Sequence, residues 1–188
     1  MSALCATSEM KSVNQQPTVR LMNAAHGEVL MPVVGLGTGG YGEPDGSGAE
    51  YWGPEQGHNA TLAWLKMGGR RIDTSNDYAS RDGSGTGWVA SGIPRSEIFI
   101  TSKVDPTNYD QVLEAFATIL KSLQTNYVDL LLIHWPGEQP GQPGKPIPPC
   151  VRAIGVSNYE VNHLLEIFNL NSTIPSVNQV CPIHEIFS

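Results

Sequence analysis

The chain has 188 residues, of which 40% are hydrophobic and 15% are charged, and its formal net charge is −7. This composition is that of a globular protein and excludes a disordered or fibrous chain. The acidic balance argues against a general nucleic-acid-binding protein, which normally carries a basic stripe. No stretch reaches the roughly 20 apolar residues that span a bilayer. The three cysteines are widely spaced and predict neither a disulfide framework nor a zinc site.

The N-terminal segment MSALCATSEMKSVNQQ lacks the basic start and the apolar core of a secretory signal. We therefore expect a cytoplasmic protein with a disordered tail over residues 1–16 and one domain over residues 17–188. We expect no metal site and no nucleic-acid or membrane partner.

From about residue 18 onward, short apolar segments alternate with amphipathic helical segments, a pattern typical of parallel α/β folds. The pattern first predicts a β-hairpin within residues 18–32 that turns near His26 and Gly27. Six buried strands are then expected over residues 32–38, 70–75, 97–104, 127–135, 152–158 and 176–183.

Three helices are predicted from apolar residues spaced three and four apart. The first covers residues 59–67 and is expected to bury Leu62, Ala63, Leu65 and Met67. The second is capped by Thr107 and buries a stripe of Val112, Phe116, Ile119 and Leu123. The third follows residue 158 and is expected to bury Val161, Leu164, Leu165 and Phe168.

Two stretches rich in glycine and proline interrupt this alternation. Residues 39–58 are predicted to form a long loop, of a size that is usually functional or disordered. The segment GEQPGQPGKPIPPC, residues 137–150, stands where a crossover helix should be, and its prolines and glycines prevent one. We therefore expect an extended strap between the fourth and fifth strands.

Four residues that handle protons fall at or just beyond the ends of consecutive predicted strands: Asp73, Tyr78, Lys103 and His134. Parallel barrels build their active sites at the carboxyl ends of the strands. Each residue alone has a simpler explanation, such as a helix cap for Asp73 or a solvated charge for Lys103. The set as a whole predicts a catalytic site on one rim.

The segments VVGLGTG, RRIDTSNDY, IFITSKV, VDLLLIHWPG, RAIGVSN and SVNQV resemble, in order and spacing, the motif series of the aldo-keto reductase family. The resemblance covers residues 18 to 183. It implies a partial (β/α)8 TIM-type barrel with about six of eight strands and an N-terminal hairpin. It also implies that the chain uses NADPH, without a Rossmann fold, to reduce a small carbonyl substrate.

The resemblance also assigns roles to the four rim residues. Tyr78 would be the general acid that protonates the carbonyl oxygen as hydride arrives. A phenol gives up its proton reluctantly at neutral pH, and a nearby ammonium such as that of Lys103 favours the phenolate. Asp73 would pair with Lys103, and His134 would hydrogen-bond the carbonyl oxygen and orient the substrate.

For the cofactor, the resemblance implies that Ser157, Asn158 and Gln179 bind the nicotinamide carboxamide. Thr38 would lie near the ribose, and Asp73 would also border the cofactor. Capping of the following helix is an alternative explanation for Ser157 and Asn158. Trp135 is expected to line the substrate pocket, with simple packing as its alternative.

The chain also departs from the family pattern. The seventh and eighth strands, which carry much of the phosphate-binding region of such barrels, have no counterpart in the sequence. Gly39-Gly40 replaces a usual tryptophan, residues 81–92 are a poor helix, and Cys181-Pro182 replaces a common acidic and aromatic pair. Two sheet edges would be left open, which favours self-association or a covering partner.

Three functional hypotheses follow. The first is a working NADPH-dependent reductase of an aldehyde or ketone. The second is a catalytically impaired, truncated isoform or a regulatory binding module of the same fold. The third is a structural or interaction protein. The choice of NADPH over NADH rests on the resemblance alone, and the substrate's identity is not readable from the sequence.

Overall fold

The computed structural model describes residues 16–24, 27–40, 51–137, 147–170 and 172–180. The tail expected over residues 1–16 lies outside these ranges, apart from Gln16. Strands β1 (Thr18–Arg20) and β2 (Leu30–Pro32) pair antiparallel, with Val19 opposite Met31. The predicted hairpin is therefore confirmed, and on the described side of its turn Gly27 has a left-handed φ of 81°.

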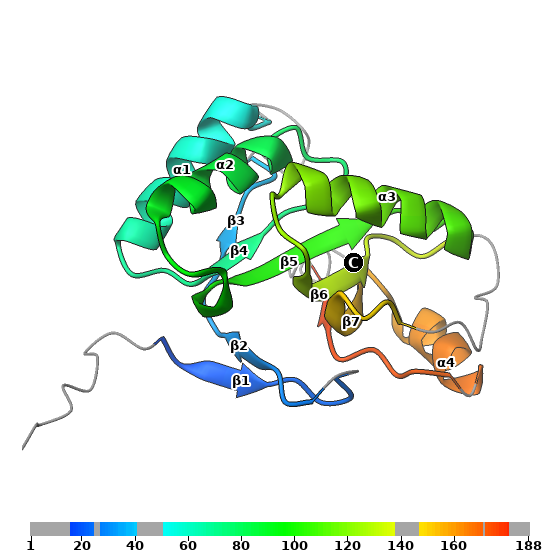
Figure 1. The fold of residues 1–188 in the computed structure, drawn as a ribbon. Helices are drawn as coiled ribbons and strands as arrows, with labels where there is room; N and C mark the ends of the chain where they lie inside the picture. The colour runs from blue at the N-terminus through cyan, green and yellow to red at the C-terminus, as the bar shows by residue number, and fades with distance from the viewer. Residues whose placement is uncertain (1–15, 25–26, 41–50, 138–146, 171, 181–188) are drawn as a thin grey trace, which may run out of the picture.

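Six parallel strands follow the hairpin and lie side by side in chain order, curled into part of a barrel (Figure 1). They are β3 (Leu36–Gly37), β4 (Arg71–Asp73), β5 (Phe99–Val104), β6 (Val128–Ile133), β7 (Val151–Ser157) and β8 (Asn178–Gln179). Strands β3 and β8 form the two edges of this sheet. The predicted α/β partial barrel with six strands is thus confirmed.

The first strand of the sheet is shorter than predicted, and most of the segment expected to form it is exposed. Val33 and Val34 lie on the surface, and Pro32 belongs to β2. The reason is that the Val33 amide donates to the carbonyl of Pro17, which ties this segment to the hairpin. Parallel pairing starts only at Leu36, which lies opposite Ile72.

Helices α1 (Pro54–Lys66), α2 (Arg81–Ser91) and α3 (Tyr109–Ser122) cover one face of the sheet (Figure 1). A short 3-10 helix, η1 (Arg95–Glu97), leads into β5. Helix α1 begins earlier than predicted because Pro54 fits the first turn, where no backbone donor is needed. Its buried residues are Gly57, Thr61 and Leu65, whereas Met67 is exposed, so the predicted buried face is only partly right.

The segment 81–92 forms a helix although its four glycines gave it poor intrinsic propensity. Helices α1 and α2 lie against each other (Figure 1). Two of the glycines, Gly83 and Gly87, lie at their contact, and Gly85 lies against the end of α3. A Cβ on Gly83 would overlap the carbonyl of Pro54, and one on Gly87 would lie 2.6 Å from the carbonyl oxygen of His58. The prediction of a poor helix is therefore wrong, because close backbone packing compensates for the weak propensity.

Helix α3 carries the predicted apolar stripe, with Phe116, Ile119 and Leu123 buried. Its cap differs from the prediction by one residue. The side chain of Asn108, not that of Thr107, accepts a hydrogen bond from the Gln111 amide. Asparagine is at least as good a cap as threonine, so the helix begins where the stronger acceptor stands.

The alternation of side chains along the strands divides the core into two parts. One set faces the helices and includes Ile100, Val104 and Leu131. The other faces the inside of the partial barrel, where Leu130 and Leu132 pack with Leu21 and Val29 of the hairpin segment. The hairpin therefore closes the end of the barrel at which the strands begin.

A buried aspartate joins three strands at the same end. The carboxylate of Asp129 accepts from the Ile100 amide at 2.9 Å and from Arg95 and Arg152 at 2.8 and 2.7 Å. The buried carboxylate of Asp129 is thus compensated by hydrogen bonds from two guanidinium groups and one backbone amide, as a buried charge requires.

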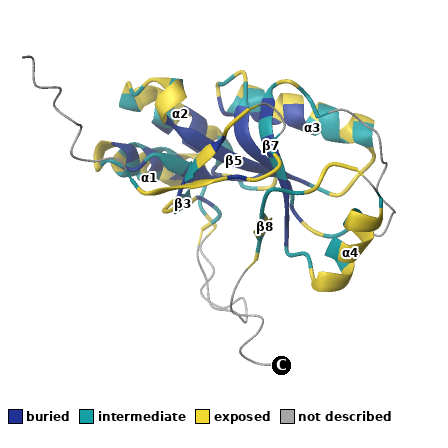
Figure 2. Cartoon of the chain, turned by 90° about the horizontal axis from the view of Figure 1, so that it is seen from below, coloured by how far each residue is buried: buried dark blue, intermediate teal, exposed yellow. Residues whose placement is uncertain are grey.

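Helix α4 (Val161–Asn169) does not bury the face predicted for it. Val161, Leu165 and Phe168 are exposed, and no residue of this helix, which is described throughout, is fully buried (Figure 2). The prediction followed the spacing of the apolar residues, which identifies an apolar face but not what covers it. Of the strap expected over residues 137–150, the described residues 137 and 147–150 are not helical, and residues 138–146 lie outside the described ranges.

The helices within the described ranges are all too short or too polar to cross a lipid bilayer.

We predict that Gly83→Ala lowers the free energy of unfolding by about 1–3 kcal/mol through overpacking, although alanine is intrinsically the better helix former. The reason is the overlap of the new Cβ with the Pro54 carbonyl. Urea denaturation followed by circular dichroism measures the effect. Gly37→Ala is the matched control because its Cβ would meet no atom within 4 Å. A stabilised Gly83→Ala protein would contradict the packing of α1 on α2.

Candidate active site

The carboxyl ends of the parallel strands bring the predicted catalytic residues to one rim. The register places Asp73 beside Thr101, Lys103 beside Leu132, and Ser157 beside Gln179. His134 comes directly after β6, and its backbone amide donates to the carbonyl of Val104. These residues come from five adjacent strands, so their proximity depends on the parallel topology alone.

Lys103 and Asp73 form an ion pair inside this rim. Lys103 is only 3% exposed and Asp73 only 7%. The Lys103 ammonium donates to Oδ1 of Asp73 and also, at 3.2 Å, to the backbone carbonyl of Thr74. The second carboxylate oxygen of Asp73 accepts from Nε2 of Gln179 at 2.9 Å. Both buried charges are therefore paired and hydrogen-bonded, as expected from the sequence.

Tyr78 lies between this ion pair and His134. The Lys103 ammonium is 5.1 Å from the centre of the Tyr78 ring, and the ring centres of Tyr78 and His134 are 5.8 Å apart in an edge-to-face arrangement. Gly39 packs against the tyrosine, and a Cβ there would lie 2.9 Å from Cζ of Tyr78. The glycine that departs from the family pattern thus leaves room for the phenol.

His134 is buried and its ring is oriented by two neighbours. Its Nδ1 lies 3.1 Å from Oγ of Ser75 and 3.1 Å from Oδ2 of Asp77. Trp135 stacks beside it, with ring centres 5.8 Å apart, and is 51% exposed. The exposed indole next to a buried histidine gives the site an aromatic wall that faces solvent.

A pair of carboxyl groups, Asp77 and Asp105, also borders His134. One ligand-type atom from each of the three residues lies within 4.8 Å of the others. Burial raises the pKa of Asp105, and the neighbouring Asp77 raises it further through its charge and a hydrogen bond, while His134 acts in the opposite direction. We call Asp77 and Asp105 the carboxyl pair. It makes this side of the site acidic.

The three residues expected to bind the nicotinamide carboxamide are linked at the ends of β7 and β8. Oγ of Ser157 donates to the Gln179 carbonyl at 2.9 Å, and Nδ2 of Asn158 donates to the His134 carbonyl at 3.1 Å. Asn158 has a left-handed φ of 60°, and α4 is capped by Glu160. Helix capping therefore does not explain Ser157 or Asn158, and that alternative is wrong.

Gln179 and Thr38 differ in whether a hydrogen-bonding atom remains unused. Oε1 of Gln179 is buried and has no hydrogen-bond partner among the described residues, although its Nε2 is bonded to Asp73. Thr38 is fully buried, and its hydroxyl donates to the backbone carbonyl of Asp73 at 3.1 Å. Gln179 thus retains an acceptor that fits an amide donor, whereas the Thr38 hydroxyl is used within the fold.

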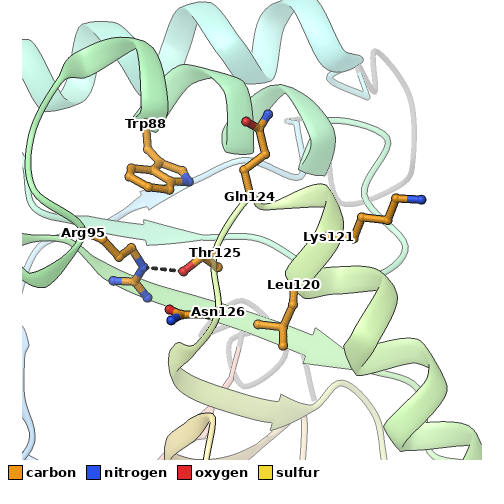
Figure 3. A pocket seen from close by; sticks show the side chains of 7 residues that line it. All are labelled: Trp88, Arg95, Leu120, Lys121, Gln124, Thr125 and Asn126. Atoms are coloured by element: carbon orange, nitrogen blue, oxygen red, sulfur yellow. Dashed lines mark hydrogen bonds between the residues drawn. The ribbon is translucent and has the colours of Figure 1, made fainter.

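A hollow of about 450 Å³ lies at the opposite end of the sheet (Figure 3). Its wall combines Trp88 and Arg95 with the turn that leads from α3 to β6. The two largest polar side chains of this wall are engaged internally, because Arg95 donates to Thr125 and Asp129, and Trp88 donates to the Leu123 carbonyl. We therefore place the candidate active site at the rim and not in this hollow.

Sequence reasoning missed Ser75, Asp77 and Asp105 as site residues. A signal was available, because Asp77 directly precedes Tyr78 and Asp105 stands two residues after Lys103. The strand-end argument that selected Asp73 and Lys103 applied equally to the first loop residues beyond each strand.

We predict that Lys103→Met lowers the free energy of unfolding by about 3–5 kcal/mol, because it leaves the Asp73 carboxylate buried without its cation. The double variant Lys103→Met/Asp73→Asn should recover much of this loss, since no buried charge remains. Urea denaturation of the single and double variants measures the coupling between the two residues. A loss below about 1 kcal/mol in Lys103→Met would show that the pair is not a buried ion pair.

We predict that Asp105→Asn stabilises the chain more at neutral pH than at acidic pH. The folded state raises the pKa of Asp105, so the protonated form is favoured by folding and stability is lost as pH rises through that pKa. Asparagine removes this loss. Melting temperatures of both proteins between pH 4 and 7 measure it, with the exposed Glu97→Gln as control. A difference that shrinks as pH rises would contradict the prediction.

Comparison with known proteins agrees with this geometry. The sequence profile described as "Aldo/keto reductase family" matches residues 33–140, more than half of the chain. The glyoxal reductase of Bacillus subtilis is 39% identical over 171 residues, which cover 82% of this chain and 55% of that protein. The 9,11-endoperoxide prostaglandin H2 reductase of Trypanosoma cruzi is 37% identical over 86% of this chain and 56% of its own length.

A solved structure shares the fold as well. The crystal structure of the Bombyx mori aldo-keto reductase in complex with NADP matches with a TM-score of 0.71 and 30% identity, over 88% of this chain and 58% of that one. The chain thus spans a little over half the length of the proteins that it matches. By sequence profile, sequence identity and fold, it belongs to the aldo/keto reductase family.

Proposed function

We propose that this chain acts as an NADPH-dependent reductase of aldehydes or ketones. The observation that carries the proposal is the buried ion pair of Lys103 and Asp73 beside Tyr78, with the His134 ring also next to the phenol ring. A proton donor, a cation that favours its deprotonated form, and a second hydrogen-bonding group therefore border one point on the rim. Carbonyl reduction needs these three groups around the oxygen that gains charge.

The described residues fit the nicotinamide end of the proposed cofactor. Oε1 of Gln179 is an unpartnered buried acceptor beside Ser157 and Asn158, which suits a carboxamide. When bound, the reduced nicotinamide supplies the hydride. The preference for NADPH over NADH is carried over from the family, and the Bombyx mori protein that this chain resembles is described in complex with NADP.

In this proposal the chain's own residues handle the carbonyl oxygen. The carbon of the substrate carbonyl accepts the hydride together with the hydride's electron pair, and the C=O π electrons move to the oxygen. Tyr78 then transfers its phenolic proton to that oxygen to give the alcohol. Lys103 stabilises the phenolate that remains, and Asp73 holds Lys103 in place. His134 hydrogen-bonds the carbonyl oxygen and orients it, and the exposed face of Trp135 lines the approach.

The two edges of the sheet favour a second candidate function. Within the described residues, these edges are strands β3 and β8. A catalytically impaired form that binds cofactor or a partner chain, including a second copy of itself, would retain the rim without turnover. Exposed sheet edges are the places where such association occurs.

We predict that Tyr78→Phe reduces turnover of glyoxal with NADPH by about 10²–10⁴-fold, because only the proton donor is removed. NADPH binding, followed by quenching of tryptophan fluorescence, should stay unchanged. Tyr127→Phe is the matched control, since Tyr127 lies at the start of β6 next to Arg95, at the other end of the sheet. Cofactor binding without turnover in the parent chain would favour the second candidate, and no binding by a folded chain would contradict the proposal.

A further inference from the structure

The carboxyl pair, Asp77 and Asp105, transfers no proton in the chemistry proposed above, yet it borders the histidine that orients the substrate. Oδ2 of Asp77 is 3.1 Å from Nδ1 of His134, and the Asp77 side chain is 41% exposed. Asp105 reaches the same point from the loop after β5. The two residues come from different loops, so the fold, not the local sequence, places both at the mouth of the site.

The described cations near this mouth are already engaged. Lys103 is bonded to Asp73 and to the Thr74 carbonyl. Arg81, at the start of α2, donates to the side chain of Asn76 at 3.0 Å and lies 3.6 Å from Asp82. Neither cation forms an ion pair with Asp77 or Asp105 in the described structure, so neither one neutralises the charge of the carboxyl pair directly.

The charge of Asp77 also acts on Asp105. Burial, the charge of Asp77 and a hydrogen bond with Asp77 all raise the pKa of Asp105, whereas His134 lowers it, because two close carboxyl groups resist ionising together. An incoming negative group would meet the same repulsion, whereas a cation would relieve it. The exposed indole face of Trp135 beside His134 adds a surface on which an aromatic or cationic group can rest.

We propose that Asp77 and Asp105 act as a charge filter on the substrate, which disfavours carbonyl compounds bearing an anionic group and accepts neutral and cationic ones. This inference deepens the proposed function and rests on it for the reactive substrates. The same charge preference applies to binding alone, so cationic compounds should bind more tightly than anionic ones even without turnover. Two like charges about 6–8 Å apart at an effective dielectric constant of about 20 repel enough for at least a tenfold effect.

The turnover test uses three benzaldehydes that differ only in the para group: sulfonate, nitro and trimethylammonium. We expect kcat/KM for the sulfonate to be at least about tenfold below that of the nitro compound, and the trimethylammonium compound to equal or exceed the nitro compound. In Asp77→Asn/Asp105→Asn the ratio of sulfonate to nitro compound should rise about tenfold or more. Glu97→Gln removes one charge at the other end of β5 and should leave the ratio unchanged. Chelator is present throughout to keep metal ions from the carboxyl pair.

The binding test needs no chemistry. Benzyltrimethylammonium and benzenesulfonate are titrated into the full chain, and the His134 ring resonances are followed by NMR. We expect the cation to shift them at concentrations at least about tenfold lower than the sulfonate does, and the double asparagine variant to lose this difference. Equal binding of both probes, or an unchanged preference in the variant, would overturn the filter. Selective binding of the cation without turnover of any aldehyde would uphold the filter while contradicting the proposed reductase activity.

Discussion

The buried ammonium of Lys103 is the constraint around which the rim is organised. A charge that is 3% exposed must be paired and hydrogen-bonded, because its desolvation is otherwise too costly. Asp73 supplies the counter-charge from the neighbouring strand, and Gln179 binds the other oxygen of the same carboxylate from the far edge of the sheet. The ion pair therefore links β4 to β5, and the hydrogen bond from Gln179 adds β8. The position of the pair determines where the Lys103 ammonium lies relative to Tyr78.

The two ends of the sheet carry different tasks. Where the strands begin, the hairpin closes the interior, and Asp129 ties Arg95, Arg152 and the backbone of β5 together. Where the strands end, polar side chains are gathered around Tyr78, and Oε1 of Gln179 is buried without a partner among the described residues. In the proposed function, a bound ligand supplies that partner.

Much of the fold was predictable from the sequence. Hydrophobic spacing predicts the order of the strands, the hairpin and the apolar stripe of α3. It does so because the face of a helix or strand that packs on the core must be apolar. The same reasoning failed for α2 and α4. The helix that contains Gly83 and Gly87 is stabilised by close packing on α1, whose backbone leaves no room for a side chain at either position. The apolar face of α4 has no described element packed on it. Both outcomes depend on a neighbour, which local spacing does not reveal.

For the site, the sequence by itself determined the set that we propose to react: Asp73, Tyr78, Lys103 and His134 stand at or just beyond successive strand ends, and parallel strands bring those ends together. Only the tertiary structure decided the surroundings of that set. Asp77 and Asp105 are separated by 28 positions in the chain and meet only because β4 and β5 pair in register beside His134. Gly39 faces the Tyr78 ring for the same kind of reason. The order of the strands shows that a residue lies at the rim of the sheet. The distance between two residues of different loops at that rim depends on how the whole sheet packs.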